Sequence, residues 1–345
     1  MGEARTIISK RNNVGVQESY MFFYYDLSGY RMYLDVEHST NDRFSSTGTY
    51  TTNTNYIYDF IYDGTLAAAN RVRLYNGETL DRTATETSAT ILNNNSPLNI
   101  GTTHETDPRP FGGYIAEIIT YTTALNDAQR IIVNNYLSSK YNIALSANDK
   151  YVGDTPGNGN YDRNVAGIGA EASGSNPTFS ATATLGMGIA TRSGLGTGDY
   201  VLAGHAVASN SVNITDVSGI SGTNPARWER IWYVDVTNAG AVLQADIEFD
   251  MVAGGMSGTT PATHTNYKLL YRAGTSGAWT EVATASSISG TKVIFASYNF
   301  NNDADDGYYT IGTMNYTVSP LPIELLSFDA IMNNKQVDIT WSTAT

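Results

Sequence analysis

Residues 5–122 contain short stretches in which apolar and polar positions alternate, and this alternation predicts β-strands. The stretches are rich in β-branched and aromatic residues, and turn-forming Gly, Asn and Asp residues separate most of them. They read TIISK, SYMFFYYDL, YRMYLDVE, NYIYDFIYDG, RVRLY, PLNIG and GYIAEIITY. We therefore expect an all-β sandwich of two packed sheets. The Asn76-Gly77 pair in RLYNGETL also predicts a hairpin with a type I′ turn.

The stretch NDAQRIIVNNYLSSKYNIAL, residues 126–145, is where apolar residues instead recur at a helical spacing. Asn126 is a suitable N-cap, and Gln129 can complete a capping box. The apolar stripe would consist of Ala128, Ile131, Ile132, Tyr136 and Leu137, with Asn134, Asn135, Ser138 and Ser139 facing away. A helix of about four turns is marginal alone, so the stripe must dock on other residues. We expect it to dock on the sandwich that precedes it.

Strand patterns resume over residues 148–313, without helical periodicity. They read VAGIGA, TATLGMGIA, YVLAGHA, ERIWYVDVT, VLQADIEFDM, YKLLYRA, TKVIFASYNF and GYYTIGT. Gly, Ser and Asn residues lie between them, which predicts a second β-sandwich. The two prolines of YTVSPLPIELL then favour a linker, and the last residues read as two strands around Asn333-Asn334.

Composition narrows the classes of function. The chain has 345 residues and no cysteine, which excludes disulfides, thiolate metal sites and a cysteine nucleophile. The net charge of -13 repels phosphate backbones, so nucleic acid is not an expected partner. No apolar run reaches the ~18 residues that a membrane-spanning helix needs. The start lacks the apolar core of a signal peptide and the end stops within a strand pattern, so we expect a piece of a longer chain.

The stretches ANRVRLYNGE and LNIGTTHETDPRPFGGYIAEIITYTTALNDAQRIIVNNYLSSKYNI resemble a known family. They are similar to the closing strands and terminal helix of laminin-G-like, concanavalin A-like jelly rolls, which occur in secreted and surface proteins of Bacteroidota. The resemblance covers residues 5–145. It implies that the helix ends the jelly roll and packs on it. The family's domain is longer at its N-terminus, which implies that the first strands are missing here.

Two later regions also resemble known segments. YDRNVAGIGAEASG, DYVLAGHA, ERIWYVDVT and DGYYTIGT are similar to a β-sandwich of unassigned function that follows such jelly rolls. LPIELLSFDAIMNNKQVDITWSTAT resembles the segment before the C-terminal sorting modules of type IX secreted proteins, which implies a location outside the cell or at its surface. The expected domains are a jelly roll over 1–146, a second sandwich over 147–315, and a linker with the start of a truncated module over 316–345.

The motif DIEFD is the candidate for catalysis. On a strand Asp246, Glu248 and Asp250 share one face, and glucanases with concanavalin-like sandwiches carry Glu, Asp and Glu at a similar spacing. Retaining hydrolysis needs two carboxyl groups about 5 Å apart. The alternative is a half-buried strand, with Ile247 and Phe249 inward and the carboxylates in solvent.

The motif NFNNDADDGYY offers Asp303, Asp305 and Asp306, whose oxygen atoms are of the kind that calcium binds. Its glycine comes one position too late for an EF-hand loop, and the final ligand position is Gly312 rather than Glu. A polar turn between strands is the alternative, because Asn, Asp and Gly favour turns. Calcium elsewhere stays open, because laminin-G-like domains often hold an ion at a loop rim.

An aromatic stripe is the candidate for ligand binding. Its members Tyr56, Tyr58, Phe60 and Tyr62 alternate with Ile57, Asp59, Ile61 and Asp63, so they share one face of a strand. Sugar rings stack on exposed tyrosine faces, and the hydroxyl adds a polar contact. On an open sheet the stripe would bind a glycan; the alternative is that it is buried as core.

The leading hypothesis is a non-catalytic fragment of a secreted or cell-surface protein that acts in adhesion or in binding a glycan or a surface protein. Neighbouring domains of the same chain are the other expected partners. The alternative is a glycoside hydrolase that uses the Asp246, Glu248 and Asp250 face. It requires a groove with aromatic walls, for which Trp228 and Trp232 are nearest in sequence, and a carboxyl group with a raised pKa.

Overall fold

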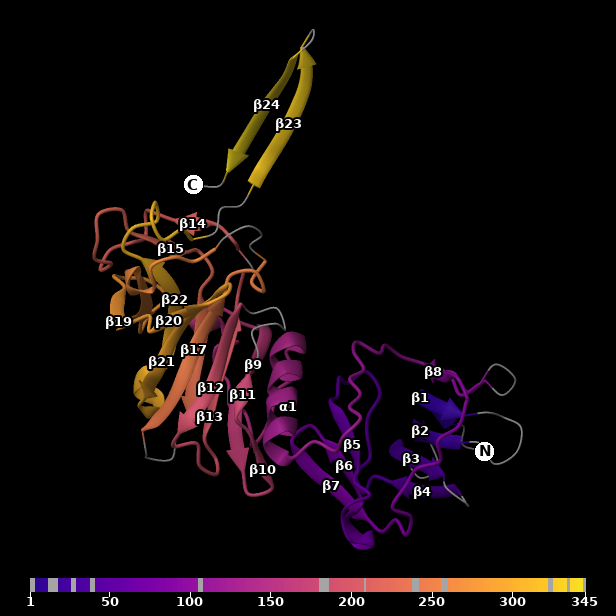
Figure 1. Ribbon diagram of the computed structural model, residues 1–345. Coiled ribbons are helices and arrows are strands. Elements are labelled where there is room, and N and C mark those ends of the chain that lie inside the picture. The colour runs from indigo at the N-terminus through magenta and orange to yellow at the C-terminus, as the bar shows by residue number, and fades with distance from the viewer. Residues whose placement is uncertain are drawn as a thin grey trace. The chain divides into compact units, whose positions relative to one another are not determined.

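The structure is a computed structural model, and its chain divides into two compact units, Met1–Leu125 and Asn126–Thr345 (Figure 1). It describes residues 4–11, 18–25, 29–37, 41–104, 108–179, 186–207, 209–237, 242–255, 260–321, 325–333 and 336–343. Strands dominate both units, and α1 (Asp127–Tyr141) is the one α-helix among these residues. The all-β prediction is confirmed.

The N-terminal unit contains two sheets. One has the order β4-β3-β2-β1-β8 and the other the order β5-β6-β7. Their strands are β1 (Ala4–Arg11), β2 (Glu18–Tyr25), β3 (Arg31–Glu37), β4 (Asn41–Ser45), β8 (Leu98–Ile100), β5 (Tyr58–Tyr62), β6 (Val72–Asn76) and β7 (Thr79–Ala84), with the 3-10 turn η1 (Ala68–Asn70) before β6. Phe22 and Leu34 of the first sheet share one buried cluster with Val72 and Leu74 of the second. The two sheets are therefore packed as a sandwich.

The predicted hairpin joins β6 to β7, but its turn differs from the expected one. Asn76 pairs with Thr79, so the two turn residues are Gly77 and Glu78. Gly77 has a φ of 54° and is the one turn residue with positive φ, whereas a type I′ turn requires two.

The segment GYIAEIITY, residues 113–121, forms no strand, contrary to expectation. The side chains of Tyr114, Ile119 and Tyr121 are exposed, and no strand among the described residues pairs with the segment. Alternation gives a segment the capacity to form a strand, but a strand also needs a neighbour that supplies hydrogen-bond partners.

The second unit also contains two packed sheets. The larger has nine strands, with the path β10-β9-β13-β16-β22-β15-β14 and with β18 and β19 added beside β22. The smaller has the order β11-β12-β17-β21-β20. The strands are β9 (Arg163–Glu171), β10 (Gly174–Asn176), β11 (Thr178–Phe179), β12 (Met187–Ser193), β13 (Tyr200–His205), β14 (Val212–Asn213), β15 (Ala226–Trp228), β16 (Trp232–Thr237), β17 (Leu243–Asp250), β18 (Tyr267–Arg272), β19 (Thr280–Thr284), β20 (Ser287–Ser289), β21 (Lys292–Phe300) and β22 (Gly307–Thr313), and the short 3-10 turns are η2 (Pro156–Asn158), η4 (His264–Asn266) and η5 (Asn302–Asp305).

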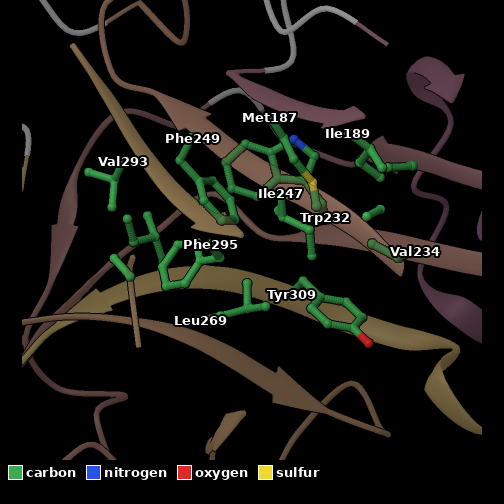
Figure 2. Packing of buried hydrophobic residues seen from close by; sticks show 14 of the residues in the cluster. Met187, Ile189, Trp232, Val234, Ile247, Phe249, Leu269, Val293, Phe295 and Tyr309 are labelled. Carbon is green, nitrogen blue, oxygen red and sulfur yellow. The ribbon is translucent and has the colours of Figure 1, made fainter. Parts of the chain in front are cut away.

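The main core of the second unit lies between these sheets (Figure 2). Trp232 and Val234 of the larger sheet meet Ile247 and Phe249 of the smaller one. The rings of Trp232 and Phe249 lie edge to face at 5.3 Å. All four side chains are fully buried, and each contributes about 1.5–3 kcal/mol by leaving water. The inward placement of Ile247 and Phe249 is as the alternation predicted.

Helix α1 covers the outer face of the nine-stranded sheet. Its Ile131 and Ile132 share a buried cluster with Tyr200 and Leu202 of β13. At the helix start the Asn126 side chain completes the predicted capping box and also donates to the Ser175 carbonyl. The expected docking of the helix on the preceding sandwich is therefore wrong, because its buried contacts lie within the second unit.

The helix face that packs inward is also more polar than expected. Asn134, Asn135, Ser138 and Ser139 are buried, whereas Tyr136 and Leu137 are only half-buried. The Asn135 amide donates to the Asn148 carbonyl at 2.8 Å, and its oxygen accepts from the Lys150 amide at 2.8 Å. The loop after the helix is thus fixed by hydrogen bonds that hydrophobic spacing cannot reveal.

The last described strands, β23 (Leu325–Asn333) and β24 (Gln336–Thr343), form an antiparallel hairpin of their own. The predicted turn residue Asn334 lies outside the described residues. Met332 pairs with Val337, and both side chains are more than half exposed. The assignment of this hairpin to a third module stays a prediction.

Candidate functional site

Strand β17 presents its carboxylates on the outer face of the five-stranded sheet, opposite the core. Asp246 is bound by Arg192, whose Nε lies 2.7 Å from both carboxylate oxygens and whose Nη2 lies 2.5 Å from Oδ2. The Ser297 amide donates to Oδ1 at 2.9 Å. The hydrogen bond from Arg192 is the largest cause that lowers the pKa of Asp246. Asp246 is therefore ionised and held in place.

Glu248 and Asp250 have different surroundings. Glu248 Oε1 accepts from Lys292 Nζ at 2.6 Å. Its side chain is 25% exposed, and no hydrogen bond from the described residues reaches its Oε2. Asp250 is 7% exposed, and its Oδ1 accepts from the Ala253 amide and the Thr291 hydroxyl. Asp250 thus closes a turn, and only the other two carboxylates are available to a ligand.

Asp246 and Glu248 line a hollow of about 320 Å³ on this outer face. The rest of its lining is Thr178, Phe179, Ile189, Ala190 and Ile294. Small residues on β12 make the room: a Cβ on Gly188 would come within 2.7 Å of Glu248 Cγ. Because 320 Å³ is near the lower end of ligand pockets, the hollow suits a small group.

The hollow lacks the features that the hydrolase hypothesis requires. Trp228 and Trp232 are fully buried between the sheets, and the one aromatic residue of the lining is Phe179. The pKa of Asp246 is lowered, whereas a general acid needs a raised one. The arrangement is that of two ion-paired carboxylates, which can accept hydrogen bonds.

The aspartates predicted to bind calcium lie at the turn before β22. Asp305 Oδ2 accepts from the backbone and side-chain amides of Asn301, and Asp306 Oδ1 accepts from the Val236 amide at 2.8 Å. The side chain of Asp303 lies outside the described residues. Among described residues no group of three or more His, Asp or Glu side chains is placed to hold a metal ion. The geometry is that of a hydrogen-bonded turn, and calcium binding stays a prediction.

The aromatic stripe on β5 packs toward the other sheet of the N-terminal unit. The ring centroids of Phe60 and Phe22 lie 5.0 Å apart, and the Tyr62 hydroxyl donates to the Ser88 carbonyl at 2.8 Å. All four stripe residues are half-buried against the core of this sandwich. The face of the strand is therefore not an open surface, and the part of the stripe that borders an exposed loop is its beginning, at Tyr56.

Around Tyr56 the structure brings together five aromatic residues, which we call the aromatic end cluster. They are Tyr24, Tyr50, Tyr56, Tyr58 and Phe111. Tyr56 stacks on Tyr58, with ring centroids 5.4 Å apart and an angle of 28° between the ring planes. The Tyr24 hydroxyl donates to the Tyr58 hydroxyl at 2.7 Å. Burial raises the pKa of Tyr24 and Tyr50 to about 12, so both hydroxyls stay protonated at neutral pH.

A polar loop, residues 51–55, borders this cluster. All its residues are exposed, and Asn53 has a left-handed φ of 60°. The Thr51 amide lies 3.1 Å from the Tyr56 hydroxyl, and the Thr51 and Thr54 hydroxyls lie 3.0 Å apart. Hydrogen bonds from Thr51 are the main reason that the pKa of Tyr56 is lowered. The loop therefore places hydroxyl and amide groups beside an aromatic ring in a fixed geometry.

Reasoning from the sequence found Tyr56, Asp246 and Glu248 through their alternation, but it missed their partners. Tyr50 lies at the other end of the loop 51–55, Phe111 comes from a distant loop, and Arg192 and Lys292 lie 54 and 44 residues from the carboxylates that they bind. The local sequence carries no signal for these pairings. The polar loop is visible in the sequence as TTNTN, but its composition alone does not indicate binding.

Among the described residues, no helix has the length and apolar character needed to cross a membrane. Comparisons with curated proteins and with solved structures found no match. One protein family does match: the sequence model of Laminin_G_3, described as the concanavalin A-like lectin/glucanases superfamily, aligns with residues 1–129. The N-terminal compact unit and the first residues of α1 are thus similar to the concanavalin A-like superfamily.

Proposed function

We propose that this chain is a non-catalytic binding protein and that its N-terminal unit binds a glycan at the aromatic end cluster. The observation that carries the proposal is the placement of Tyr56, stacked on Tyr58 and bordered by the exposed loop 51–55. A tyrosine face offers stacking to the apolar side of a sugar ring, and the neighbouring hydroxyls and amides exchange hydrogen bonds with its polar edge.

The family match supports the same class of function. The concanavalin A-like superfamily includes lectins, and the match covers the region in which the aromatic end cluster lies. The family name also includes glucanases, but the carboxylates of β17 lie outside the matched region. Binding without hydrolysis is therefore favoured over the enzymatic alternative.

The proposal extends to location. The protein would act in adhesion at the cell surface or outside the cell, after export by a type IX system. The support is the resemblance of residues 321–345 to the segment before sorting modules of such proteins.

A glycan array probed with the purified chain tests the binding, with and without calcium. We expect a defined set of glycans to bind, and Tyr56→Ala to weaken binding about tenfold by removing a stacking contact of roughly 1–1.5 kcal/mol. Tyr114→Ala is the matched control, because this tyrosine of the same unit is fully exposed and lies outside the cluster. A broad array that stays negative in both conditions would refute glycan binding.

A further inference from the structure

The hollow beside Glu248 belongs to the second unit, outside the aromatic end cluster and outside the family match. Its two carboxylates are not equivalent. Asp246 uses both oxygens on Arg192 and Ser297, whereas Glu248 Oε2 receives no hydrogen bond from any described residue. A quarter of the Glu248 side chain is exposed. Glu248 thus offers an accessible acceptor to a ligand.

A donor stands next to this acceptor. Lys292 Nζ carries three N–H groups, and its one hydrogen bond to a described residue goes to Glu248 Oε1. Its side chain is 32% exposed. An acceptor and a donor side by side match two neighbouring hydroxyl groups, because one hydroxyl can donate to Oε2 while the next accepts from Nζ.

Most of the lining of the hollow beside Glu248 is apolar, and Lys292 lies next to Glu248 without being part of that lining. Ala190 faces outward on β12 beside Asp246, and Ile294 lies beside Glu248 on β21. Both line the hollow together with Thr178. An apolar surface of this kind can pack against the C–H face of a ligand ring, while Glu248 and Lys292 form hydrogen bonds with the hydroxyl groups at the edge of that ring.

The charge balance selects the class of ligand. Each carboxylate is matched by one cation, Arg192 for Asp246 and Lys292 for Glu248. A cationic ligand would compete with these two side chains, and an anionic ligand would be repelled by the carboxylates. A neutral ligand can bind without breaking either ion pair.

We propose that this hollow binds one ring of a neutral, hydroxyl-rich molecule such as a sugar. Glu248 and Lys292 exchange hydrogen bonds with adjacent hydroxyls, and Ala190 and Ile294 contact the ring. The site does not depend on the aromatic end cluster, so the chain would hold a second saccharide contact in its second unit.

Saturation-transfer NMR on the full chain tests the site, with neutral methyl hexosides, a methyl hexuronide and an amino sugar as probes. We expect at least one neutral hexoside to bind. Glu248→Gln should weaken it by about tenfold or more, since a charged acceptor makes a stronger hydrogen bond than a neutral one. Ala190→Leu should abolish binding by filling the hollow. Melting temperatures confirm that each variant is folded.

Two controls separate this site from the other proposal. Gln244→Ala changes an outward residue of the same strand outside the hollow and should bind like the unaltered chain. Tyr56→Ala should also keep the binding of the neutral hexoside. If this variant loses that binding, the signal comes from the N-terminal unit and the proposal is overturned. Three other results would also overturn the proposal: no neutral hexoside binds, the binding persists in Ala190→Leu, or the chain prefers a charged sugar.

Discussion

His205 at the end of β13 shows how a single buried side chain makes stability depend on pH. It is fully buried, and the Asn164 amide donates to its Nε2 at 3.0 Å. Burial, and after it the nearby cations Arg230 and Arg163, lowers the pKa of His205 to about 4. The neutral ring is therefore the form that fits the folded chain.

The sign of the effect follows from comparing the two states. An unfolded histidine takes up a proton near pH 6.5, whereas His205 in the folded chain does so only near 4. Its contribution is fully present above about pH 6.5 and is lost as the pH falls toward 4, at roughly 1.4 kcal/mol per pH unit. We expect the free energy of unfolding, measured with urea, to fall between pH 7.5 and 4.5 by about 2–3 kcal/mol more in the unaltered chain than in His205→Gln. Equal losses would contradict this role.

The candidate sites show how much single residues reveal. Alternation correctly placed Asp246 and Glu248 on an outer face and grouped Tyr56 with its stripe. It did not show that Arg192 neutralises Asp246. Nor did it show that the stripe packs against the other sheet and that only its beginning borders an exposed loop. Those facts depend on contacts between residues that are far apart in sequence.

Helix α1 separates what local sequence determines from what it does not. The capping residues Asn126 and Gln129 predicted where the helix begins, because capping is a local interaction. The predicted docking partner is wrong, because an apolar stripe requires a partner surface but does not identify which part of the chain provides it. The nine-stranded sheet provides that surface through Tyr200 and Leu202.

Asn135 should stabilise the second unit more than its polar character suggests. Replacing it by alanine leaves the Asn148 carbonyl and the Lys150 amide without their partner. We expect Asn135→Ala to lower the free energy of unfolding by about 1–3 kcal/mol, measured by denaturant titration. Asn299→Ala, at an exposed position on β21, should change it by less than about 0.5 kcal/mol. A negligible effect of Asn135→Ala would show that water replaces both bonds.

The segment at 113–121 shows that a strand-like sequence can fail to form a strand. It is rich in β-branched and aromatic residues, as the strands are, yet it pairs with no described strand. A sheet forms through pairing between segments, so a strand-like sequence is not sufficient by itself. β2 of the first unit and β16 of the second were predicted from the same kind of pattern, and each has neighbouring strands that supply its hydrogen bonds.

At the scale of the molecule, the two compact units each have their own core. Ile131 packs in the second unit, so its truncation should act there alone. We expect Ile131→Ala to destabilise that unit by about 2–5 kcal/mol and to shift one calorimetric transition while the other stays in place. A shift of the transition that belongs to the N-terminal unit would show that the helix docks there instead.

Affinity chromatography of neutral oligosaccharides on the immobilised chain, with mass spectrometry of the eluate, tests binding without cleavage most directly. The account predicts that retained oligosaccharides elute at their original length and that retention falls in Tyr56→Ala. Shortened oligosaccharides with new reducing ends, formed by the unaltered chain but not by Glu248→Gln, would contradict it and establish a hydrolase.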